Sequence, residues 1–427
     1  MPRDPPSPAP KRHGRGEASR ISTFNLALLA VGATVLLVGL FSDLVKRAML
    51  SGPLIALVLG VLLGPQVTGL LDPARWGEES LLLEQAARLT VAMSLMGIAM
   101  RLSGPYFRRN TRSLAVVLVP LMVAMWLVTG LLAFWILGVP IWVAMLVGAV
   151  LTPTDPVVAS SIVQGSVAQR CIPARVRNFL SAESGANDGL AYPLVFLAVL
   201  MLERPAAEAL PHWLLHTLLW EVGAAVILGA ALGYVAGLLL RWGRAHHTDT
   251  GTSLLVYSLA LTLTVLGATK LAGTDGLLAV FVAGLLFSRT ISAEDEKREE
   301  NIQEAINNFF LLPVFVLLGL ALPWREWAEL GWRGPALAVA VLLLRRLPAY
   351  MALSPLMHPV RDLRETVFLG WFGPIGVAAL FYANLSLHET PTNLAWTAGS
   401  LVICASVLAH GVTAKPMTQW LGRGSRP

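Results

Sequence analysis

The sequence predicts an all-α polytopic membrane protein with about thirteen transmembrane helices, and two observations carry this prediction. Hydrophobic residues make up 55% of the 427 residues and charged residues only 14%, well below the roughly 25% charged residues of a soluble domain. The apolar residues fall into repeated runs of about 20, each long enough to cross about 30 Å of hydrocarbon as a helix. Together with a mean hydropathy of +0.65, these values exclude a soluble protein.

The apolar runs are separated by short connections. The predicted spans cover approximately residues 24–42, 50–71, 81–100, 113–138, 139–164, 176–202, 214–240, 251–270, 274–289, 303–322, 334–355, 365–387 and 395–420. The longest charged linker, 292–300, is only a loop. We therefore expect one membrane domain over 24–421, with a disordered, basic and Pro-rich tail over 1–23 before it and a short cytoplasmic tail over 422–427 after it.

Lysine and arginine gather in alternate loops, as expected when cytoplasmic loops carry the excess. The poorer set of loops, leaving the N-terminal tail aside, holds only Arg75, Arg204, Lys270, Arg325 and Arg333. One wrong span in the middle would mix the two sets, so the asymmetry supports the assignment and predicts a cytoplasmic C-terminus. The basic N-terminal tail then lies outside, against the rule, which leaves the true start and the first span open.

The remaining composition excludes other classes of function. The net charge of +6 comes mostly from loops that face anionic headgroups, so we expect contact with lipid and no nucleic-acid binding. Cys171 and Cys404 are too few for a disulfide framework or a metal cluster, and we expect no cofactor.

The fifth span contains Leu-Thr-Pro-Thr-Asp-Pro-Val-Val at residues 151–158. Pro153 and Pro156 lack an N–H and would break the helix. In lipid, broken backbone is tolerated only where it is buried in protein or lines a cavity, and such breaks recur at small-cation sites. Two prolines alone more often mark a kink, but Asp155 between them favours a site. Its carboxylate can stabilise the positive end of the half-helix that begins there.

The sixth span carries Glu-Ser-Gly-Ala-Asn-Asp-Gly at residues 183–189. An ionisable residue near the bilayer centre costs about 2.5–3.5 kcal/mol on insertion scales and indicates function. Ser184 and Asp188 share one helix face, whereas Glu183 and Asn187 share the next. Burial favours a neutral carboxyl and an arriving cation favours a charged one. We therefore expect Asp188 to hold either a proton or a cation.

The available ligands predict the kind of ion. Asp188, Ser184, Thr154, backbone carbonyls and water are oxygen ligands, which suit a hard alkali cation and not a transition metal. The alternative is a structural cluster that ties helices together by hydrogen bonds.

The eleventh span has Arg345 and Arg346 near its middle. An unpaired buried arginine would be prohibitive, so Glu183 is expected to pair with one of them. Successive helix residues point about 100° apart, so only one arginine can readily face Glu183.

The twelfth span has a matching interruption, Gly-Trp-Phe-Gly-Pro-Ile-Gly-Val at residues 370–377. Gly373, Pro374 and Gly376 weaken this helix in mid-membrane. Paired interruptions in two halves of a chain indicate an inverted-repeat transporter with two broken, crossing helices. We expect repeats over about 24–202 and 251–421, joined by a linker helix over 214–240.

These motifs together resemble the monovalent cation:proton antiporter superfamily, in its branch of prokaryotic and animal sodium/proton exchangers, along nearly the whole chain. The resemblance implies that Asp188 binds the ion, with Thr154, Ser184 and the carbonyl of Thr152. It also implies that Asn187 holds the two broken helices in register. For the partner of Glu183, Arg346 fits the family spacing slightly better than Arg345.

The resemblance further implies a secondary active transporter and not an enzyme. It would exchange Na⁺, or alternatively K⁺ or Li⁺, for H⁺ by alternating access, and the Asn-Asp pair is typical of electroneutral exchange. Similar proteins are homodimers, and the expected location is a cell membrane, most simply a bacterial inner membrane.

Two departures from the family pattern concern the electrostatics and the ion. Gly185 and Ala186 stand where bulky residues are common, and Ile375 stands where an arginine is frequent. A cation channel and an organic-anion carrier on the same fold remain alternatives, although no repeated pore loop is visible and an anion site would be expected to lack the buried aspartate.

Overall fold

The computed structural model describes residues 51–75, 78–102, 104–155, 170–246, 254–290, 307 and 309–424, together with 29, 32–33 and 36. Regular structure in these ranges is entirely helical, which confirms the predicted all-α fold. Pro156, the half-helix expected after Asp155, the first predicted span and the linker 292–300 lie outside the described residues, apart from those isolated positions.

Among the described residues, seven helices are long and apolar enough to cross a membrane. They are Glu79–Arg101, Arg109–Leu137, Ala174–Glu203, Ala206–His246, Leu254–Ala272, Arg333–Leu356 and Leu394–Arg423. The bent pair Phe309–Leu320 and Trp324–Leu330 makes an eighth if it is one span. The chain is therefore a multi-span membrane protein, whereas the count of thirteen stays a prediction.

The helices are bounded as follows. They are α3 (Gly52–Leu63), α4 (Glu79–Arg101), α5 (Gly104–Val116), α6 (Met122–Leu137), α7 (Ile141–Val150), α10 (Ala174–Leu190), α11 (Tyr192–Glu203), α12 (Ala206–His212), α13 (Gly223–His246), α14 (Leu254–Ala272), α15 (Gly276–Ser288), α17 (Trp324–Leu330), α18 (Arg333–Leu344), α19 (Leu347–Leu353), α20 (Leu363–Trp371), α21 (Val377–Glu389) and α22 (Leu394–Gly424). The π-helical segments Val117–Leu121 and Trp213–Val222 join α5 to α6 and α12 to α13.

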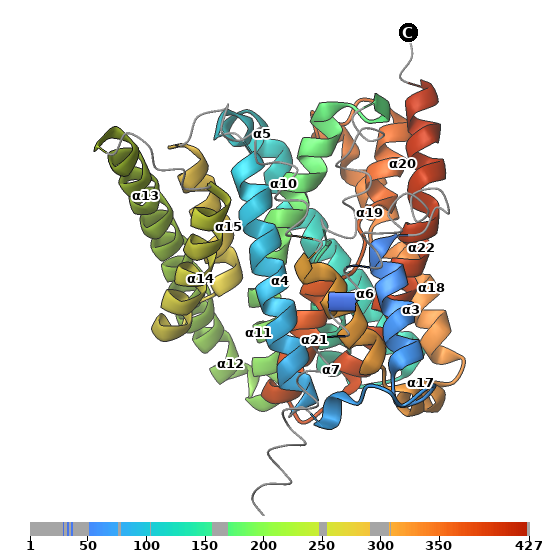
Figure 1. Cartoon of the computed structure of the whole chain (residues 1–427). Coiled ribbons are helices and arrows are strands. Elements are labelled where there is room, and N and C mark those ends of the chain that lie inside the picture. Colours follow the sequence, from blue (N-terminus) through green and yellow to red (C-terminus); the bar gives the residue numbers. More distant parts are fainter. Residues whose placement is uncertain are drawn as a thin grey trace, which may run out of the picture.

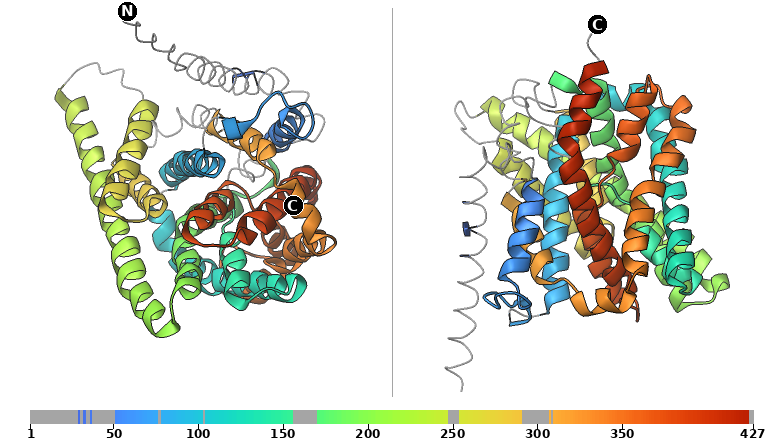
Figure 2. Two further views of the ribbon diagram at one scale, coloured as in Figure 1. Left: turned by 90° about the horizontal axis from the view of Figure 1, so that it is seen from below. Right: turned by 90° about the vertical axis from the view of Figure 1, so that its right-hand side faces the viewer.

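The helices α13, α14 and α15 form one side of the molecule, and α4 and α10 lie between them and the bundle that contains α7, α18 and α20 to α22 (Figures 1 and 2). Glycines on one face of α13 allow it to pack closely on α15. A Cβ at Gly229 would lie 2.9 Å from the Cα of Ala279, and one at Gly233 would lie 2.7 Å from the Cα of Ala283. The predicted linker span 214–240 lies inside the continuous helix Ala206–His246.

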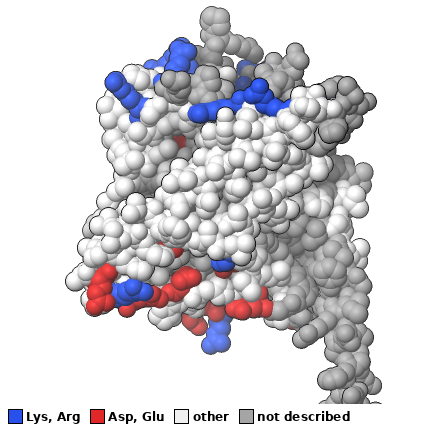
Figure 3. All heavy atoms as spheres, turned by 90° about the vertical axis from the view of Figure 1, so that its left-hand side faces the viewer, with Lys and Arg blue, Asp and Glu red and all other residues white. Residues whose placement is uncertain are grey.

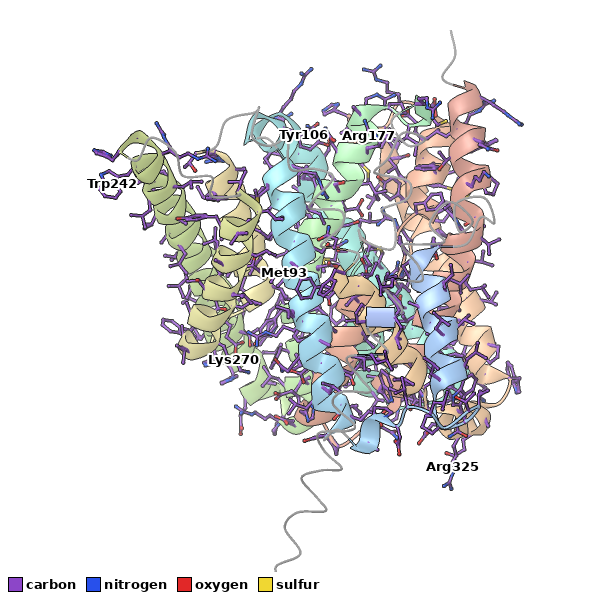
Figure 4. The ribbon with its side chains drawn as sticks, in the orientation of Figure 1. Met93, Tyr106, Arg177, Trp242, Lys270 and Arg325 are labelled. Atoms are coloured by element: carbon purple, nitrogen blue, oxygen red, sulfur yellow. The ribbon has the colours of Figure 1, made fainter. Side chains whose placement is uncertain are left out.

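Charge divides the two ends of the molecule. Lysine and arginine gather at the end that carries the C-terminus, and aspartate and glutamate gather at the opposite end (Figure 3). Arg177, from the loops rich in arginine, lies toward the C-terminal end, whereas Lys270 and Arg325, from the poorer set, lie at the other (Figure 4). The structure thus places these representatives of the two sets at opposite ends.

In the described part of the chain, three helices end in breaks near the middle of the molecule. The first break, residues 151–155, follows α7, and the second, residues 372–376, separates α20 from α21. The third separates α18 from α19 at Arg345 and Arg346. Pro348 in the first turn of α19 explains this third break, because a proline has no N–H to continue the hydrogen bonds of α18.

Candidate ion-binding site

Asp155 joins the first break to the second. Its peptide N–H donates to the carbonyl of Pro374 at 2.7 Å, and its Oδ2 accepts from the N–H of Val377 at 2.5 Å. Val377 begins α21, whose first N–H groups lack partners within the helix and carry partial positive charge. A Cβ at Gly376 would lie 2.9 Å from the Cβ of Asp155, so glycine makes room for this contact. In the described structure Asp155 therefore caps the half-helix of the other break.

Arg345 occupies the opposite ends of the same two breaks. Its guanidinium donates to the carbonyl of Leu151, which caps α7, and to the carbonyl of Gly373, which follows α20. It also approaches the carbonyls of Thr152 and Pro153, each at 3.4 Å. A cation is favourable there because the C-terminal end of a helix carries partial negative charge. One side chain thus stabilises two half-helix ends.

Ile375, which stands where an arginine is frequent in the family, is fully buried. Its N–H donates to the Ser406 Oγ of α22 at 2.7 Å. Arg345 therefore supplies, at the carbonyls of the two breaks, a positive charge that position 375 does not.

Glu183 pairs with Arg346. The carboxylate receives two hydrogen bonds from the guanidinium, Nη2 to Oε2 at 2.9 Å and Nη1 to Oε1. The Arg346 Nε donates to the carbonyl of Leu369 at 3.0 Å, and its guanidinium lies over the Tyr350 ring, 4.9 Å from the centroid. Both charged side chains are almost fully buried, so each supplies the partner that the other requires. A Cβ at Gly373 would collide with Arg346.

Thr154, Ser184 and Asn187 form a polar cluster between the first break and α10. Asn187 Nδ2 donates to Thr154 Oγ1 at 2.6 Å, and the N–H of Thr154 donates to Asn187 Oδ1 at 3.1 Å. The hydroxyls of Thr154 and Ser184 are 3.2 Å apart. Asn187 thus ties α10 to the first break. Asp155 and Arg345 directly link the two breaks in the described structure, and the role of Asn187 in holding the broken helices in register stays a prediction.

Asp188 lies on α10, one turn beyond Ser184, and is only 2% exposed. Its carboxylate Oδ1 is buried and has no hydrogen-bond partner within the part of the chain that the structure describes. Its backbone carbonyl accepts from the Tyr382 hydroxyl of α21 at 2.7 Å. A buried oxygen without a partner is costly, and binding a proton or a cation would remove that cost.

Thr152 is placed less favourably for the ion than Thr154. Its hydroxyl donates to the carbonyl of Gly148 at 2.7 Å, and its own carbonyl is the one that Arg345 approaches. Its carbonyl stays a predicted ligand.

Comparison with known proteins decides the family. The model of the family described as "Sodium/hydrogen exchanger, transmembrane" matches residues 32–420. The chain belongs to the sodium/hydrogen exchanger family. It is 34% identical over 384 residues to Na(+)/H(+) antiporter 2 of Zygosaccharomyces rouxii, covering 88% of this chain and 47% of that relative. It therefore spans about half the length of that protein.

Two further comparisons cover nearly the whole chain. The Na(+)/H(+) antiporter of Schizosaccharomyces pombe is 29% identical over 428 residues, which cover 94% of this chain and 91% of that protein. The structure of the sodium proton antiporter MjNhaP1 from Methanocaldococcus jannaschii at pH 8 matches with a TM-score of 0.71 at 18% identity, covering 93% of this chain and 99% of that one. The structural match establishes the fold.

Gly185 explains part of one departure from the family pattern, and Gly189 faces the same neighbouring helix. A Cβ at Gly185 would lie 2.7 Å from the ring of Phe281, and one at Gly189 would lie 2.8 Å from the Cα of Leu278. Both partners belong to α15, so this exchanger-family chain needs small residues where the ion-site helix α10 faces α15.

Proposed function

We propose that the chain exchanges Na⁺ for H⁺ across a membrane, with Asp188 holding one ion at a time. The observation that carries the proposal is the buried Oδ1 of Asp188, which has no hydrogen-bond partner in the described structure. Asp188 also lies four residues after Ser184, on the same helix face. Family membership and the names of the relatives, Na(+)/H(+) antiporters, support it.

The exchange follows from the chemistry of one carboxyl group. When Asp188 is protonated, it is neutral and tolerates burial; when Na⁺ arrives, the proton leaves to water and the carboxylate binds the cation. The hydroxyl oxygens of Ser184 and Thr154 are hard ligands suited to complete the shell, with the Thr152 carbonyl as a further ligand. One positive charge replaces another at each exposure of the site, so the exchange is electroneutral.

The polar groups around Asp188 have supporting roles. Asp155 and Arg345 stabilise the ends of the broken helices, Glu183 and Arg346 neutralise each other, and Asn187 positions Thr154. None of these charges is required to change during the cycle. Asp188 is therefore the one aspartate of the cluster to which we assign ion exchange.

We also propose the arrangement in the membrane that the family resemblance implies. The repeats 24–202 and 251–421, joined by the linker helix 214–240, would move the site between the two sides by alternating access. The protein would be a homodimer in a cell membrane, such as a bacterial inner membrane. Its C-terminus would be cytoplasmic, in keeping with the lysine and arginine at that end.

Purified protein in liposomes tests the proposal. A pH gradient is imposed, Na⁺, K⁺ or Li⁺ is added, and a pH-sensitive dye follows the dissipation of the gradient. We expect a response to Na⁺, and a stronger response to K⁺ would reassign the ion. Failure to respond to any of the three cations, in vesicles whose protein content and folding are verified, would refute exchange.

A further inference from the structure

Asp275 is a second buried aspartate with an unused oxygen. It caps the N-terminus of α15, where its Oδ1 accepts from the N–H groups of Leu277 at 3.0 Å and Leu278 at 3.3 Å. Its Oδ2 is buried and has no hydrogen-bond partner among the described residues. Serine, threonine or asparagine would cap a helix about as well without a charge. Capping therefore accounts for one oxygen of Asp275 and leaves the charge and the second oxygen unexplained.

Glu221, in the segment between α12 and α13, is held beside Asp275. The N–H of Asp275 donates to the carbonyl of Glu221 at 3.1 Å. The Glu221 Oε2 is also buried without a hydrogen-bond partner in the described structure. Its Oε1 lies 3.6 Å from the Nδ1 of His216, whose side chain is 52% exposed, and Tyr192 interacts electrostatically with the same carboxylate. Two unsatisfied carboxylate oxygens therefore belong to one buried cluster.

The charges of this cluster do not balance. Asp275 and Glu221 interact electrostatically with each other, and Arg88 of α4 interacts with Asp275. The Arg88 guanidinium, however, donates to the carbonyl of Leu266 at 3.2 Å and to Gln85 Oε1 at 3.4 Å. Arg88 also interacts with Glu84, and the imidazole of His216 beside Glu221 is charged only when protonated. With His216 neutral the carboxylates outnumber the cations, and an unpaired buried charge is strongly unfavourable. A bound monovalent cation would neutralise it.

Tyr382 lies between the cluster and Asp188. Tyr382 donates its hydroxyl to the backbone carbonyl of Asp188 at 2.7 Å, and it also interacts with Tyr192 and Asp275. Asp275 follows α14 five residues after Lys270, which lies at the end opposite the C-terminus (Figure 4). That end gathers aspartate and glutamate (Figure 3), and such a surface raises the local cation concentration.

We propose that Asp275 and Glu221 form a second monovalent-cation site, which the cation occupies between the acidic end of the molecule and Asp188. The Asp275 Oδ2, the Glu221 Oε2 and the Tyr192 hydroxyl supply hard oxygen ligands, and water completes the shell. This inference deepens the proposed exchange function by giving the transported cation an intermediate position.

Binding of ²²Na⁺ to purified full-length protein tests the second site. The variants are Asp188→Asn, the double variant Asp275→Asn with Glu221→Gln, and the triple variant that combines them. Asparagine retains the cap of α15, and glutamine retains the shape of glutamate. Glu208→Gln, an exposed change on α12, is the control for loss of one negative charge from the same continuous helix.

We expect the wild type and Glu208→Gln to bind Na⁺ at two sites, the double variant and Asp188→Asn to keep one site each, and the triple variant to keep none. Unchanged binding in the folded double variant would overturn the second site. If Asp188→Asn binds as the wild type does while the double variant loses a site, the proposed role of Asp188 fails and the second site stands. The two proposals are therefore distinguishable.

Discussion

Asp155 and Asp188 are two aspartates of the same buried region with opposite surroundings. Their exposed fractions are nearly equal, 3% and 2%. The Asp155 carboxylate accepts from the first N–H of α21, whereas the Asp188 Oδ1 has no partner in the described structure. Burial alone therefore does not identify an exchange site. The Asp155 Oδ2 is occupied by a helix N–H, while the unused oxygen of Asp188 has room for a proton or a cation.

The largest expected effect separates these two residues. Asp188→Asn should reduce Na⁺-driven proton movement to the level of empty liposomes, because an amide can neither release a proton nor bind a cation with full charge. Asp155→Asn should keep measurable exchange, since the amide oxygen can still accept from Val377, and should cost about 1 kcal/mol of stability. The dye assay and thermal unfolding in detergent measure both variants. Comparable loss of exchange in both folded variants would contradict this distinction.

Removing one member of the Glu183–Arg346 pair should be the most destabilising single change. Arg346→Ala leaves a carboxylate buried without its partner, at a cost of about 3–5 kcal/mol. The control replaces both charges, Glu183→Leu with Arg346→Met, and should be less destabilised than Arg346→Ala alone. Unfolding in detergent followed by tryptophan fluorescence provides the measurement. A double variant less stable than the single variant would show that the pair has another function.

Arg345 should affect transport through the two breaks. Arg345→Gln retains a donor but loses the charge at the ends of α7 and α20. The interaction of a charge with a helix end is worth up to about 2 kcal/mol of free energy. We expect the exchange rate to be about tenfold lower, which corresponds to about 1.4 kcal/mol. Adding Ile375→Arg to this variant should restore part of the rate by returning a guanidinium beside the second break. Ile375→Arg in the wild type is the control and should lower the rate, because it crowds two cations in a packed site. If the combined variant shows no recovery, Arg345 does not take the place of the arginine that is frequent at position 375.

Among the site variants expected to lower the exchange rate, the smallest reduction is expected for Asn187→Ala. It removes the two hydrogen bonds to Thr154, each worth about 0.5–1.5 kcal/mol, but no charge. We expect lower stability and weaker Na⁺ binding with exchange still detectable in liposomes. Complete loss of exchange in a folded Asn187→Ala protein would place Asn187 among the groups that bind the ion.

Local sequence patterns predicted the helical membrane fold, the breaks at Pro153 and at Gly373 to Gly376, and the alternatives for the partner of Glu183. They could not predict the cap that Asp155 provides to α21, because Asp155 and Val377 are 222 positions apart in the sequence. The role of Arg345 could not be predicted either, because its partners are backbone carbonyls, which every residue has and which the sequence of side chains does not reveal.

The second carboxylate cluster was also missed. Asp275 lies at the edge of the predicted span 274–289, where a cap is the ordinary interpretation, and Glu221 lies in the predicted linker helix 214–240. An acidic residue inside an apolar span was the signal available at Glu221. Its proximity to Asp275 became apparent only from the folded chain.

In the proposed exchange, a proton and Na⁺ compete for one carboxylate, that of Asp188. The most direct test is the dependence of the Na⁺ KM on pH, measured in liposomes with equal pH on both sides. Competition predicts that the KM rises toward tenfold per unit fall in pH once Asp188 is mostly protonated, while the maximal rate at saturating Na⁺ is retained. A KM that is independent of pH, with protons lowering only the maximal rate, would contradict competition at Asp188.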